Sequence, residues 1–424
     1  MYVCGPTVYD DPHIGNARPL VVFDILFKVL KCKYGNKSVT YVRNITDIDD
    51  KIIESAKQKK ISIDVLTKNI TNSFHNDCDY LNCEKPSFEP KATENISLMI
   101  EMINVLLKNK NAYEKNSHVY FDVSSFKDYG KLSNKNIDEL KAGARVEISE
   151  NKKNPEDFVL WKPSNKDEPS WESPWGKGRP GWHLECSAMS KRYLGDTFDI
   201  HGGGRDLIFP HHENEIAQGS CISTETYCNH WFHNGIVLVD KKKMSKSLGN
   251  VILLDQLLKN YDKATIRVAL LSAHYRQPLN WTSRTLDNAM NLINKIRGCI
   301  KTDVTVDKQA QTEITEILSD DLNTPQAFKY LSDLSKSSKK NIKDNAKLLQ
   351  SCLFLGLDFK MQSKRSEIDK ALSNKVEKLI QKRNKLRSTG HYAEADEIRE
   401  ELSEIGVTLR DRDGQTEWEL DSNS

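Results

Sequence analysis

The chain of 424 residues has little net charge, no long apolar run and no framework of paired cysteines. Its formal net charge is only +2, so any surface that binds nucleic acid has to be a local patch. No apolar run approaches the roughly 18 residues that a membrane-spanning helix needs, and no cationic leader opens the sequence. The nine cysteines are odd in number and scattered, which favours reduced thiols over a disulfide scaffold. We therefore expect a soluble, cytoplasmic protein with some thiols available to a metal.

Common catalytic patterns are missing as well. The glycine run "HGGGRD" at 201–206 has the spacing of neither the P-loop nor the G-x-G-x-x-G loop, so alone it indicates only a turn. The stretch "FPHHENEIAQ" at 209–218 has the order H-H-E-N-E, which excludes the H-E-x-x-H helix of zinc proteases.

What is present first is an alternation of strands and helices. Residues 2–4 predict a strand that breaks at Gly5, and residues 12–35 predict a loop followed by a helix with Pro19 near its first position. Residues 38–50 predict a second strand, and a second helix follows. Strand, helix, strand, helix predicts a βαβ unit and hence a parallel sheet.

The rest of the chain departs from this rhythm. Residues 94–175 contain a segment rich in Pro and Trp and read as an insertion that rejoins the sheet near Trp182. Residues 196–210 predict a further strand with a glycine turn. Beyond residue 285 periodic helices dominate, and the last of them predict a helical hairpin that turns at Gly390.

Two loops could handle phosphate. "PHIGN" at 12–16 places a His and an Asn beside a helix N-terminus, which favours anions, although a plain polar loop has the same composition. "KKKMSKSLGN" at 241–250 offers lysines as point charges for a polyphosphate, although a solvated lysine run would look alike. Two separated phosphate-binding loops on one sheet are what adenylate-forming chemistry needs.

The histidine-rich stretch could hold a metal or could be a polar helix start. On a helix, residues four apart share a face, so His211 and Glu215 point together while His212 points about 100° away. A zinc site would need further ligands, and thiolates are the natural ones. The candidates are Cys4 and Cys186, which we expect near the carboxyl ends of strands, and Cys221 and Cys228, which are nearer in sequence.

Several stretches together resemble one family. "PHIGN" resembles the HIGH signature of class I aminoacyl-tRNA synthetases, and "KMSKS" at 243–247 matches their second signature. "MYVCGPTVYD", "YVRNITDIDDKI", "NPEDFVLWKPS", "GRPGWHLECSAM" and "FDIHGGGRDLIFPHHENEIAQ" look like the cysteinyl-tRNA synthetases in family order, over nearly the whole chain. The resemblance implies an ATP-dependent ligase that joins L-cysteine to tRNA(Cys), acts as a monomer and has no membrane partner.

The resemblance also implies functional residues. One Zn²⁺ per subunit would be held by Cys4, Cys186, His211 and Glu215 and would bind the substrate thiolate directly, which leaves Cys221 and Cys228 out and His212 as a bystander. The family's cysteine pocket matches Gly5, Thr7, Thr46, Trp182 and His201, of which Thr46 and Trp182 could equally be packing residues.

The nucleotide site follows from the same resemblance. His13 and Asn16 would line the phosphates of ATP, and Lys243 and Lys246 would neutralise the leaving pyrophosphate, with Mg²⁺ accompanying ATP. The remaining residues expected to border ATP are Gly15, Gly202, Gly203, Gly204 and Asp206.

The chain departs from the family pattern in two places. Asn16 stands where the last His of HIGH is expected, so it keeps a hydrogen-bond donor but cannot become cationic. The sequence also begins within the first strand, which places the zinc ligand Cys4 close to a terminus. We expect a chain that begins at Met1 to be less stable, or to lose zinc more readily, than one extended upstream.

The implied fold is α/β: a Rossmann-like parallel-sheet catalytic domain with an inserted connective domain, then a helical-bundle anticodon-binding domain and a small C-terminal domain. The expected ranges are the first catalytic half at 1–93 with a shortened first strand, the insertion at 94–177, the second catalytic half at 178–228, a stem-contact region with KMSKS at 229–290, the bundle at 291–362, and a tRNA-binding hairpin and tail at 363–424.

The tail carries a basic run with a single acid, Glu377. A solvated helix face is the usual reading of such a run, but beside the catalytic domain that the resemblance implies, contact with an RNA backbone is favoured. The basic residues of the run are Lys375, Lys378, Lys382, Arg383, Lys385 and Arg387. Two rival functions fit less well. The cysteine ligases of mycothiol biosynthesis share the core but lack such a tail, and a zinc hydrolase built on "HHENE" leaves "KMSKS" unexplained.

Overall fold

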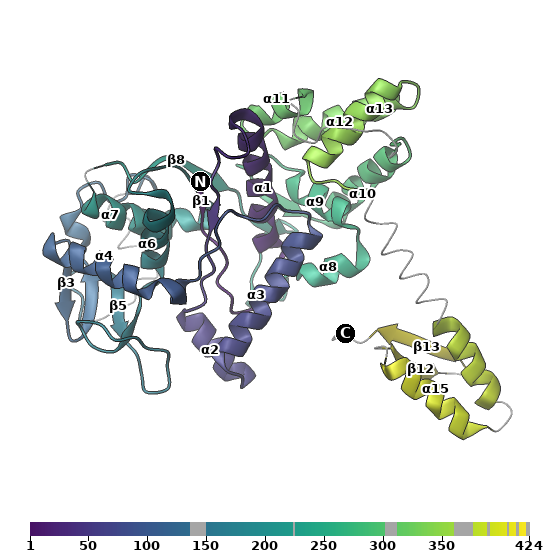
Figure 1. Ribbon diagram of the computed structural model, residues 1–424, viewed down its shortest axis with the longest axis horizontal. Helices are drawn as coiled ribbons and strands as arrows, with labels where there is room; N and C mark the ends of the chain where they lie inside the picture. The colour runs from purple at the N-terminus through teal and green to yellow at the C-terminus, as the bar shows by residue number, and fades with distance from the viewer. Residues whose placement is uncertain are drawn as a thin grey trace. The chain divides into compact units, whose positions relative to one another are not determined.

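The structure is a computed structural model that describes residues 1–135, 150–223, 225–301, 312–359, 376–387, 391–404, 407–412 and 415–420 (Figure 1). It divides into two compact units, Met1–Leu357 and Asp358–Ser424. Among the described residues, no helix has the length and apolar character that crossing a bilayer requires.

A four-stranded parallel sheet organises the first unit. Its strand order is β2–β1–β7–β8, so β1 pairs on one side with its neighbour in sequence and on the other with a strand about 200 residues away. The predicted βαβ unit and parallel sheet are therefore confirmed. The strands are β1 (Tyr2–Val3), β2 (Val42–Arg43), β7 (Phe198–Gly204) and β8 (Cys228–Asn234).

Helices connect these strands and cover the sheet. The helices that follow β1 and β2 are α1 (Ile14–Tyr34), α2 (Asp50–Lys59) and α3 (Ile63–Tyr80), and those around β7 are α6 (Trp182–Leu194) and α7 (Glu213–Ile222). A kinked π-helical turn, Ile208–His212, in which Phe209 has extended backbone angles (φ −134°, ψ 133°), leads into α7. The elements that bear the predicted site residues therefore begin where β1, β7 and the insertion end.

The expected start of the first helix is wrong. Helix α1 begins at Ile14 and has Pro19 inside it, because His13 and Asn16 form a capping box that starts the helix before the proline. Pro19 removes only the helical hydrogen bond to the carbonyl of Gly15. The capping box and the largely buried run of α1 that follows offset this loss.

The expected glycine turn after the third predicted strand is also wrong, because Gly202, Gly203 and Gly204 belong to β7 itself. A methyl group at Gly202 would lie 2.3 Å from the ring of Phe23, and one at Gly203 would lie 2.9 Å from the ring of His212. The glycines therefore let a helix and a histidine pack directly onto the strand.

The insertion forms a four-stranded antiparallel sheet with one long helix. Its elements are α4 (Ile96–Lys108), β3 (Ala112–Lys115), β4 (His118–Phe121), β5 (Phe158–Pro163) and β6 (Gly178–Pro180). Its apolar residues share one buried cluster with residues of the catalytic core, from Phe121 and Trp161 to Ala188 and Ala217. The insertion is thus packed against α6 and α7, which bear predicted site residues.

A small three-stranded sheet and a set of helices complete the first unit. The strands are β9 (Val237–Val239), β10 (Lys242–Lys243) and β11 (Leu279–Trp281), and the helices are α8 (Leu254–Asn260), α9 (Lys263–Leu271), α10 (Ser283–Arg297), α11 (Glu313–Ser319), α12 (Thr324–Ser338) and α13 (Ile342–Phe354). A buried ion pair between Arg267 of α9 and Asp24 of α1 joins them to the sheet region. The predicted change to helices near residue 285 is confirmed.

The second unit contains a helix at 376–387, α15 (Tyr392–Glu404) and the antiparallel pair β12 (Val407–Arg412) and β13 (Gln415–Leu420). Both helices of the predicted hairpin are confirmed, while its turn at Gly390 lies outside the described residues. Val376, Ile380, Ile398, Leu402 and Val407 form its buried cluster.

One basic residue of this unit differs from expectation. Arg383 was expected on the basic face, but its side chain is only 2% exposed because it lies close to β13, with Nη1 3.5 Å from Thr416 Oγ1. The other described basic residues of the run, Lys378, Lys382, Lys385 and Arg387, are exposed.

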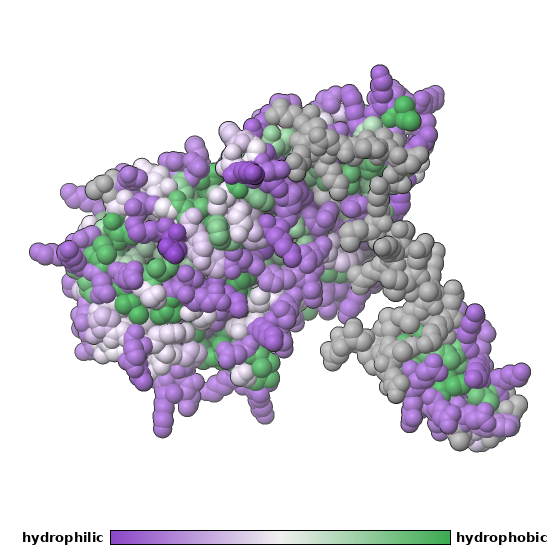
Figure 2. All heavy atoms as spheres, in the orientation of Figure 1, coloured by the Kyte–Doolittle hydropathy of each residue, from purple (hydrophilic) through white to green (hydrophobic). Residues whose placement is uncertain are grey.

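On the face shown in Figure 2, hydrophilic residues cover most of the surface and apolar residues gather in separate patches. Two of the most exposed apolar side chains are Tyr34, at the end of α1, and Ile342, at the start of α13. Many large apolar side chains of the described residues are buried, a part of them in three clusters beneath the sheets and helices.

Candidate metal centre and nucleotide site

Four side chains from distant parts of the sequence meet at one buried point. Cys4, Cys186, His211 and Glu215 each offer one ligand atom, and these atoms all lie within 4.8 Å of one another. The Sγ atoms of Cys4 and Cys186 are 3.6 Å apart, Cys4 Sγ is 3.3 Å from Glu215 Oε1, and His211 Nε2 is 3.1 Å from Glu215 Oε1.

Each of these side chains is positioned by its element. Cys4 follows β1, and its backbone N–H donates to the carbonyl of Gly202 at 3.1 Å. Cys186 lies in α6, and Asn44 Oδ1, 3.7 Å away, accepts from its thiol. His211 lies in the π-helical turn and Glu215 one turn later in α7, so the expected shared face of this pair is borne out by their contact.

A second group overlaps the first. Cys4, His201, His212 and Glu215 also place four ligand atoms within 4.8 Å of one another. His212 Nε2 lies 3.5 Å from Cys4 Sγ, and His201 Nε2 lies 2.8 Å from Glu215 Oε2. His212, expected as a bystander, therefore directly borders the metal cluster.

The electrostatics of the cluster suit a cation. Burial lowers the pKa of His211 to about 4, so its imidazole is neutral and keeps a lone pair for a ligand bond. Burial raises the pKa of Glu215, but His201 and His211 outweigh this effect and hold it below its usual value. Burial also raises the pKa of the Cys4 thiol and raises that of Cys186 to about 11. A bound cation would reverse the shift of both thiols.

The donor set fits zinc. Two sulfur ligands at about 2.3 Å from a tetrahedral ion lie about 3.8 Å apart, close to the 3.6 Å between the two Sγ atoms. Two thiols, one imidazole and one carboxylate are ligand types that zinc accepts. The described residues thus bring together the four predicted metal ligands, and neither Cys221 nor Cys228 belongs to either group.

A cavity of about 390 Å³ opens beside Cys4. The predicted site residues that line it are Cys4, Gly5, Thr7, His13, Gly15, Asn16, Trp182, Gly204, Asp206 and Lys243. It therefore extends from the metal cluster to the start of α1 and to the lysine-rich loop.

The other predicted site residues lie behind or beside this cavity. His201, Gly202 and Gly203 are buried in β7, and Thr46 is buried behind Thr7, with which it forms an isolated bridge. The Thr46 hydroxyl donates to Glu185 Oε2 at 2.6 Å. Trp182 stacks on the ring of His211 with a centroid separation of 4.3 Å.

The capping box of α1 fixes which atoms of His13 and Asn16 remain available. His13 Nδ1 accepts from the backbone N–H of Asn16 at 3.3 Å, and Asn16 Oδ1 accepts from the backbone N–H of His13 at 3.1 Å. Burial lowers the pKa of His13, so the neutral ring carries its proton on Nε2. Both side chains therefore retain N–H groups as donors.

The lysine-rich loop reaches the same region. A cavity of about 260 Å³ is lined by His13, Asn16, Met244 and Lys246, among others. The Lys246 ammonium forms an ion pair with Asp10 and lies 5.6 Å from the ring centroid of Tyr9. The structure thus brings the two predicted phosphate-binding loops to one place.

The sequence reasoning missed several side chains that contact the cluster or its neighbours, among them His183, His233, Asn44 and Tyr227, whose hydroxyl donates to Glu215 Oε2. His183 Nδ1 lies 2.9 Å from His211 Nδ1, His233 Nε2 lies 2.8 Å from His212 Nδ1, and Asn44 accepts from both Cys186 and the N–H of Gly5. His183 precedes Cys186 by three residues on α6, and this helical spacing was a signal that could have found it.

Comparison with known proteins identifies the family. Residues 1–291 match the family model "tRNA synthetases class I (C) catalytic domain", and residues 369–418 match "Cysteinyl-tRNA ligase anticodon binding domain". The chain is similar to proteins named cysteine–tRNA ligase: that of Pelagibacter ubique (strain HTCC1062) is 52% identical over 99% of this chain and 94% of that protein. The cysteine–tRNA ligase of Caulobacter vibrioides (strain NA1000 / CB15N) is 46% identical over 99% of this chain and 94% of that protein.

Solved structures show the same fold. A methionyl-tRNA synthetase of Mycobacterium tuberculosis bound by methionyl-adenylate matches with a TM-score of 0.55 at 14% identity, over 84% of this chain and 89% of that one. A structure described as a putative arginyl-tRNA synthetase from Campylobacter jejuni matches with a TM-score of 0.52 at 13% identity, over 84% and 90%. By its fold and by its full-length similarity, this chain belongs to the cysteine–tRNA ligase family of class I aminoacyl-tRNA synthetases.

Proposed function

We propose that this member of the family activates L-cysteine with ATP to cysteinyl-adenylate and transfers the cysteinyl group to tRNA(Cys). The observation that supports this most is the content of a single cavity. At one end Cys4 lines the cavity and belongs to the cluster of two thiols, an imidazole and a carboxylate, and at the other end lie the capped start of α1 and Lys243 of the lysine-rich loop. One end suits a thiol-selective metal and the other suits a polyphosphate.

At the metal end, Cys4, Cys186, His211 and Glu215 would hold zinc. When bound, zinc supplies selection, because it prefers thiolate to alcohol as a ligand, whereas a plain pocket would reject serine by little more than ~10²-fold. His201 and Tyr227 donate to Glu215 Oε2 at 2.8 and 3.0 Å and so fix the carboxylate. The chain's own residues thereby set the position of the ligands before any substrate arrives.

Next to this centre, five residues would form the cysteine pocket: Gly5, Thr7, Thr46, Trp182 and His201. Gly5 allows the backbone to pass Asn44 closely, since a methyl group there would lie 1.6 Å from the Asn44 carbonyl oxygen. Trp182 would close the pocket over the substrate side chain from its place against His211.

At the phosphate end, His13 Nε2–H and the Asn16 amide would donate to phosphate oxygens, with Gly15 allowing close approach. Lys243 and Lys246 would neutralise pyrophosphate as it leaves, and Mg²⁺ would accompany ATP. Gly202, Gly203, Gly204 and Asp206 would border the nucleotide.

The reaction balances without a covalent protein intermediate. A carboxylate oxygen of cysteine attacks the α-phosphorus in line, and the bond from this phosphorus to the bridging oxygen breaks, so pyrophosphate leaves. A hydroxyl of the terminal ribose of the tRNA then attacks the cysteinyl carbonyl, and AMP leaves. Positioning and charge stabilisation are all that the protein has to supply.

The domain assignment is part of the proposal. The catalytic halves at 1–93 and 178–228, the insertion at 94–177 and the loop-bearing region at 229–290 would carry out activation and transfer. The bundle at 291–362 and the tail at 363–424 would bind the tRNA, with the exposed Lys378, Lys382, Lys385 and Arg387 facing its backbone.

A charging assay tests the proposal. Wild-type protein and Cys186→Ser are given a tRNA(Cys) transcript with cysteine or serine, and cysteine-dependent pyrophosphate exchange is measured without tRNA. We expect the wild type to exchange pyrophosphate and to charge cysteine but not serine, and the variant to lose both reactions together with its zinc. Exchange without charging would point to a ligase with another acceptor, and unchanged cysteine activity in the variant would refute the zinc assignment.

A further inference from the structure

His183 contacts the metal cluster from outside it. It is the second residue of α6, and its Nδ1 lies 2.9 Å from Nδ1 of His211, which is a hydrogen-bond distance. The opposite ring nitrogen of His211, Nε2, lies 3.1 Å from Glu215 Oε1, inside the group of ligand atoms. His211 is therefore held between the cluster on one side and His183 on the other.

The protons on these rings can be assigned by elimination. A neutral imidazole that offers Nε2 to a metal carries its proton on Nδ1. Only one proton can lie between the two Nδ1 atoms, so His211 donates and His183 Nδ1 accepts. His183 then carries its own proton on Nε2.

We propose that His183 is a positioning residue of the metal centre, which accepts the Nδ1–H of His211 and thereby fixes both the tautomer and the orientation of this ligand. The inference rests on the proposed function, because it takes Cys4, Cys186, His211 and Glu215 as the ligands. Such outer partners of ligating histidines raise ligand basicity and metal affinity.

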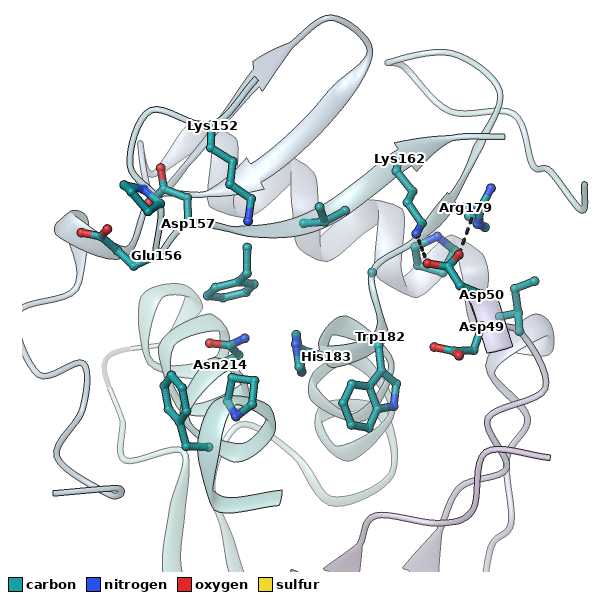
Figure 3. A pocket seen from close by; sticks show the side chains of 18 of the residues that line it. Asp49, Asp50, Lys152, Glu156, Asp157, Lys162, Arg179, Trp182, His183 and Asn214 are labelled. Carbon is teal, nitrogen blue, oxygen red and sulfur yellow. Dashed lines mark hydrogen bonds and ion pairs between the residues drawn. The ribbon is translucent and has the colours of Figure 1, made fainter. Parts of the chain in front are cut away.

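The surroundings of His183 explain why a hydrogen bond is needed to hold its ring. His183 lines a cavity of about 230 Å³ between the insertion and the catalytic core, and Figure 3 shows it there between Asn214 and Trp182. Phe158 of β5 meets the ring edge-on, with centroids 5.8 Å apart. Trp182 also packs against the ring, with centroids 5.1 Å apart. Such ring contacts do not distinguish one imidazole nitrogen from another atom of the ring, and the hydrogen bond with His211 is what orients Nδ1.

The structure contains a matched counterpart. His233 stands to His212 as His183 stands to His211, with Nε2 of His233 2.8 Å from Nδ1 of His212. His212 belongs to the second group of ligand atoms, with Cys4, His201 and Glu215. The two outer histidines therefore report on two different ligand sets: His183 on the proposed set, and His233 on the alternative.

The experiment compares two substitutions of His183, to Asn and to Gln, whose side-chain amides lie at different distances from the backbone. In His183→Asn, the side-chain oxygen takes roughly the place of Nδ1 and can accept from His211, whereas His183→Gln carries its amide to the place of Nε2. His183→Phe keeps the ring without an acceptor, and His233→Phe is the matched control. For each purified full-length protein, zinc affinity is measured by competition with a chromogenic chelator, and the absorption of the cobalt-substituted protein is recorded.

We expect His183→Phe and His183→Gln to bind zinc about 10- to 100-fold more weakly than wild type and to show altered cobalt bands. His183→Asn should stay within about threefold of wild type, and His233→Phe should be unchanged. Circular dichroism and thermal unfolding identify any variant that misfolds, and the Asn and Gln pair decides the matter even if the Phe variant does not fold.

Three results would overturn the proposal. The first is a zinc affinity equal to that of wild type in all His183 variants, and the second is an equal loss of zinc affinity in His183→Asn and His183→Gln. The third is a loss of zinc affinity confined to His233→Phe, which would assign the metal to the alternative ligand set. Failure of the proposed function is a separate outcome, because the wild type would then either bind no zinc or bind zinc without activating cysteine.

Discussion

The two ends of the proposed active site differ in burial and in the way charge is held. At the metal end, Cys186, His211 and Glu215 are at most 2% exposed, and every side chain is held by hydrogen bonds from neighbouring elements. At the phosphate end, the side chain of Lys246 is 72% exposed and is restrained by an ion pair on the surface.

This difference matches two chemical tasks. Discriminating a thiol from a hydroxyl needs ligands in fixed positions, which buried and neutral histidines can provide. Neutralising a polyphosphate that arrives and leaves needs long cationic side chains that can change position. The comparison predicts that the two ends can be disabled independently, and the following experiments test this in order of decreasing effect.

Removing the metal should have the largest effect. Dialysis against a strong chelator should lower the kcat/KM for cysteine in pyrophosphate exchange by about 10³-fold, in line with the several kcal/mol that a bound metal supplies. ATP binding, followed by calorimetry, should change little because the phosphate end lies apart from the cluster. Loss of ATP binding in the metal-free protein would contradict the independence of the two ends, and added zinc should restore activity.

Lys246→Ala should disable the opposite end. Loss of one charge that stabilises the departing pyrophosphate should lower the rate of adenylate formation by about 10²- to 10³-fold, as measured in single-turnover experiments. Zinc content should equal that of wild type, and Lys246→Arg should recover part of the rate. A variant that also lost zinc would show that the loop and the cluster are coupled.

Two alanine substitutions on β7 should show that the strand is packed more tightly at Gly202, in its inner part, than at Gly204, in its outer part. Gly202→Ala places a methyl group 2.3 Å from the Phe23 ring, and such overpacking should lower the free energy of unfolding by about 1–3 kcal/mol. Gly204→Ala meets only Oδ1 of Asp206, at the end of an exposed side chain that can rotate away, so it should cost less. Urea unfolding of both variants measures the difference, and equal losses would show that the strand is not packed more tightly at its inner part.

Asp10→Asn should have the smallest effect and should favour activity. It removes the partner of Lys246, and since exposed ion pairs contribute about 0–1 kcal/mol, the KM for ATP should fall by at most about fivefold. Burial raises the pKa of Asp10, but the hydrogen bond from Lys246 outweighs burial and lowers this pKa below 3.8. The ion pair is therefore intact at neutral pH and breaks only as the pH falls through that lowered value. The KM for ATP of the variant should therefore differ from that of wild type at pH 7; a higher KM would indicate that Asp10 binds the nucleotide complex instead.

Local features of the site were open to sequence reasoning because they depend on spacing along one element. The contact of His211 with Glu215 follows from their separation of four residues, and it survives the π-helical turn because the helix continues through both. The parallel sheet also followed from the order of strands and helices. The start of α1 was missed because the capping box of His13 and Asn16 outweighed the proline signal.

Contacts between distant elements were not accessible in this way. Spacing left Cys4, Cys186, Cys221 and Cys228 equally eligible as ligands, and only the resemblance chose between them. That Gly202 and Gly203 lie within a strand depends on what packs against them, namely Phe23 and His212.

The sequence by itself determined the family, the parallel sheet, two candidate phosphate-binding loops and one pair of ligand candidates, because motifs, periodicity and helical spacing are local properties of the chain. Only the tertiary structure decided that β1 lies between β2 and β7, and so brought Cys4 to Cys186 and gave His211 and His212 their different outer partners. The physical reason is that these contacts join residues far apart in sequence, and they form only when the strands pair and the helices pack onto them.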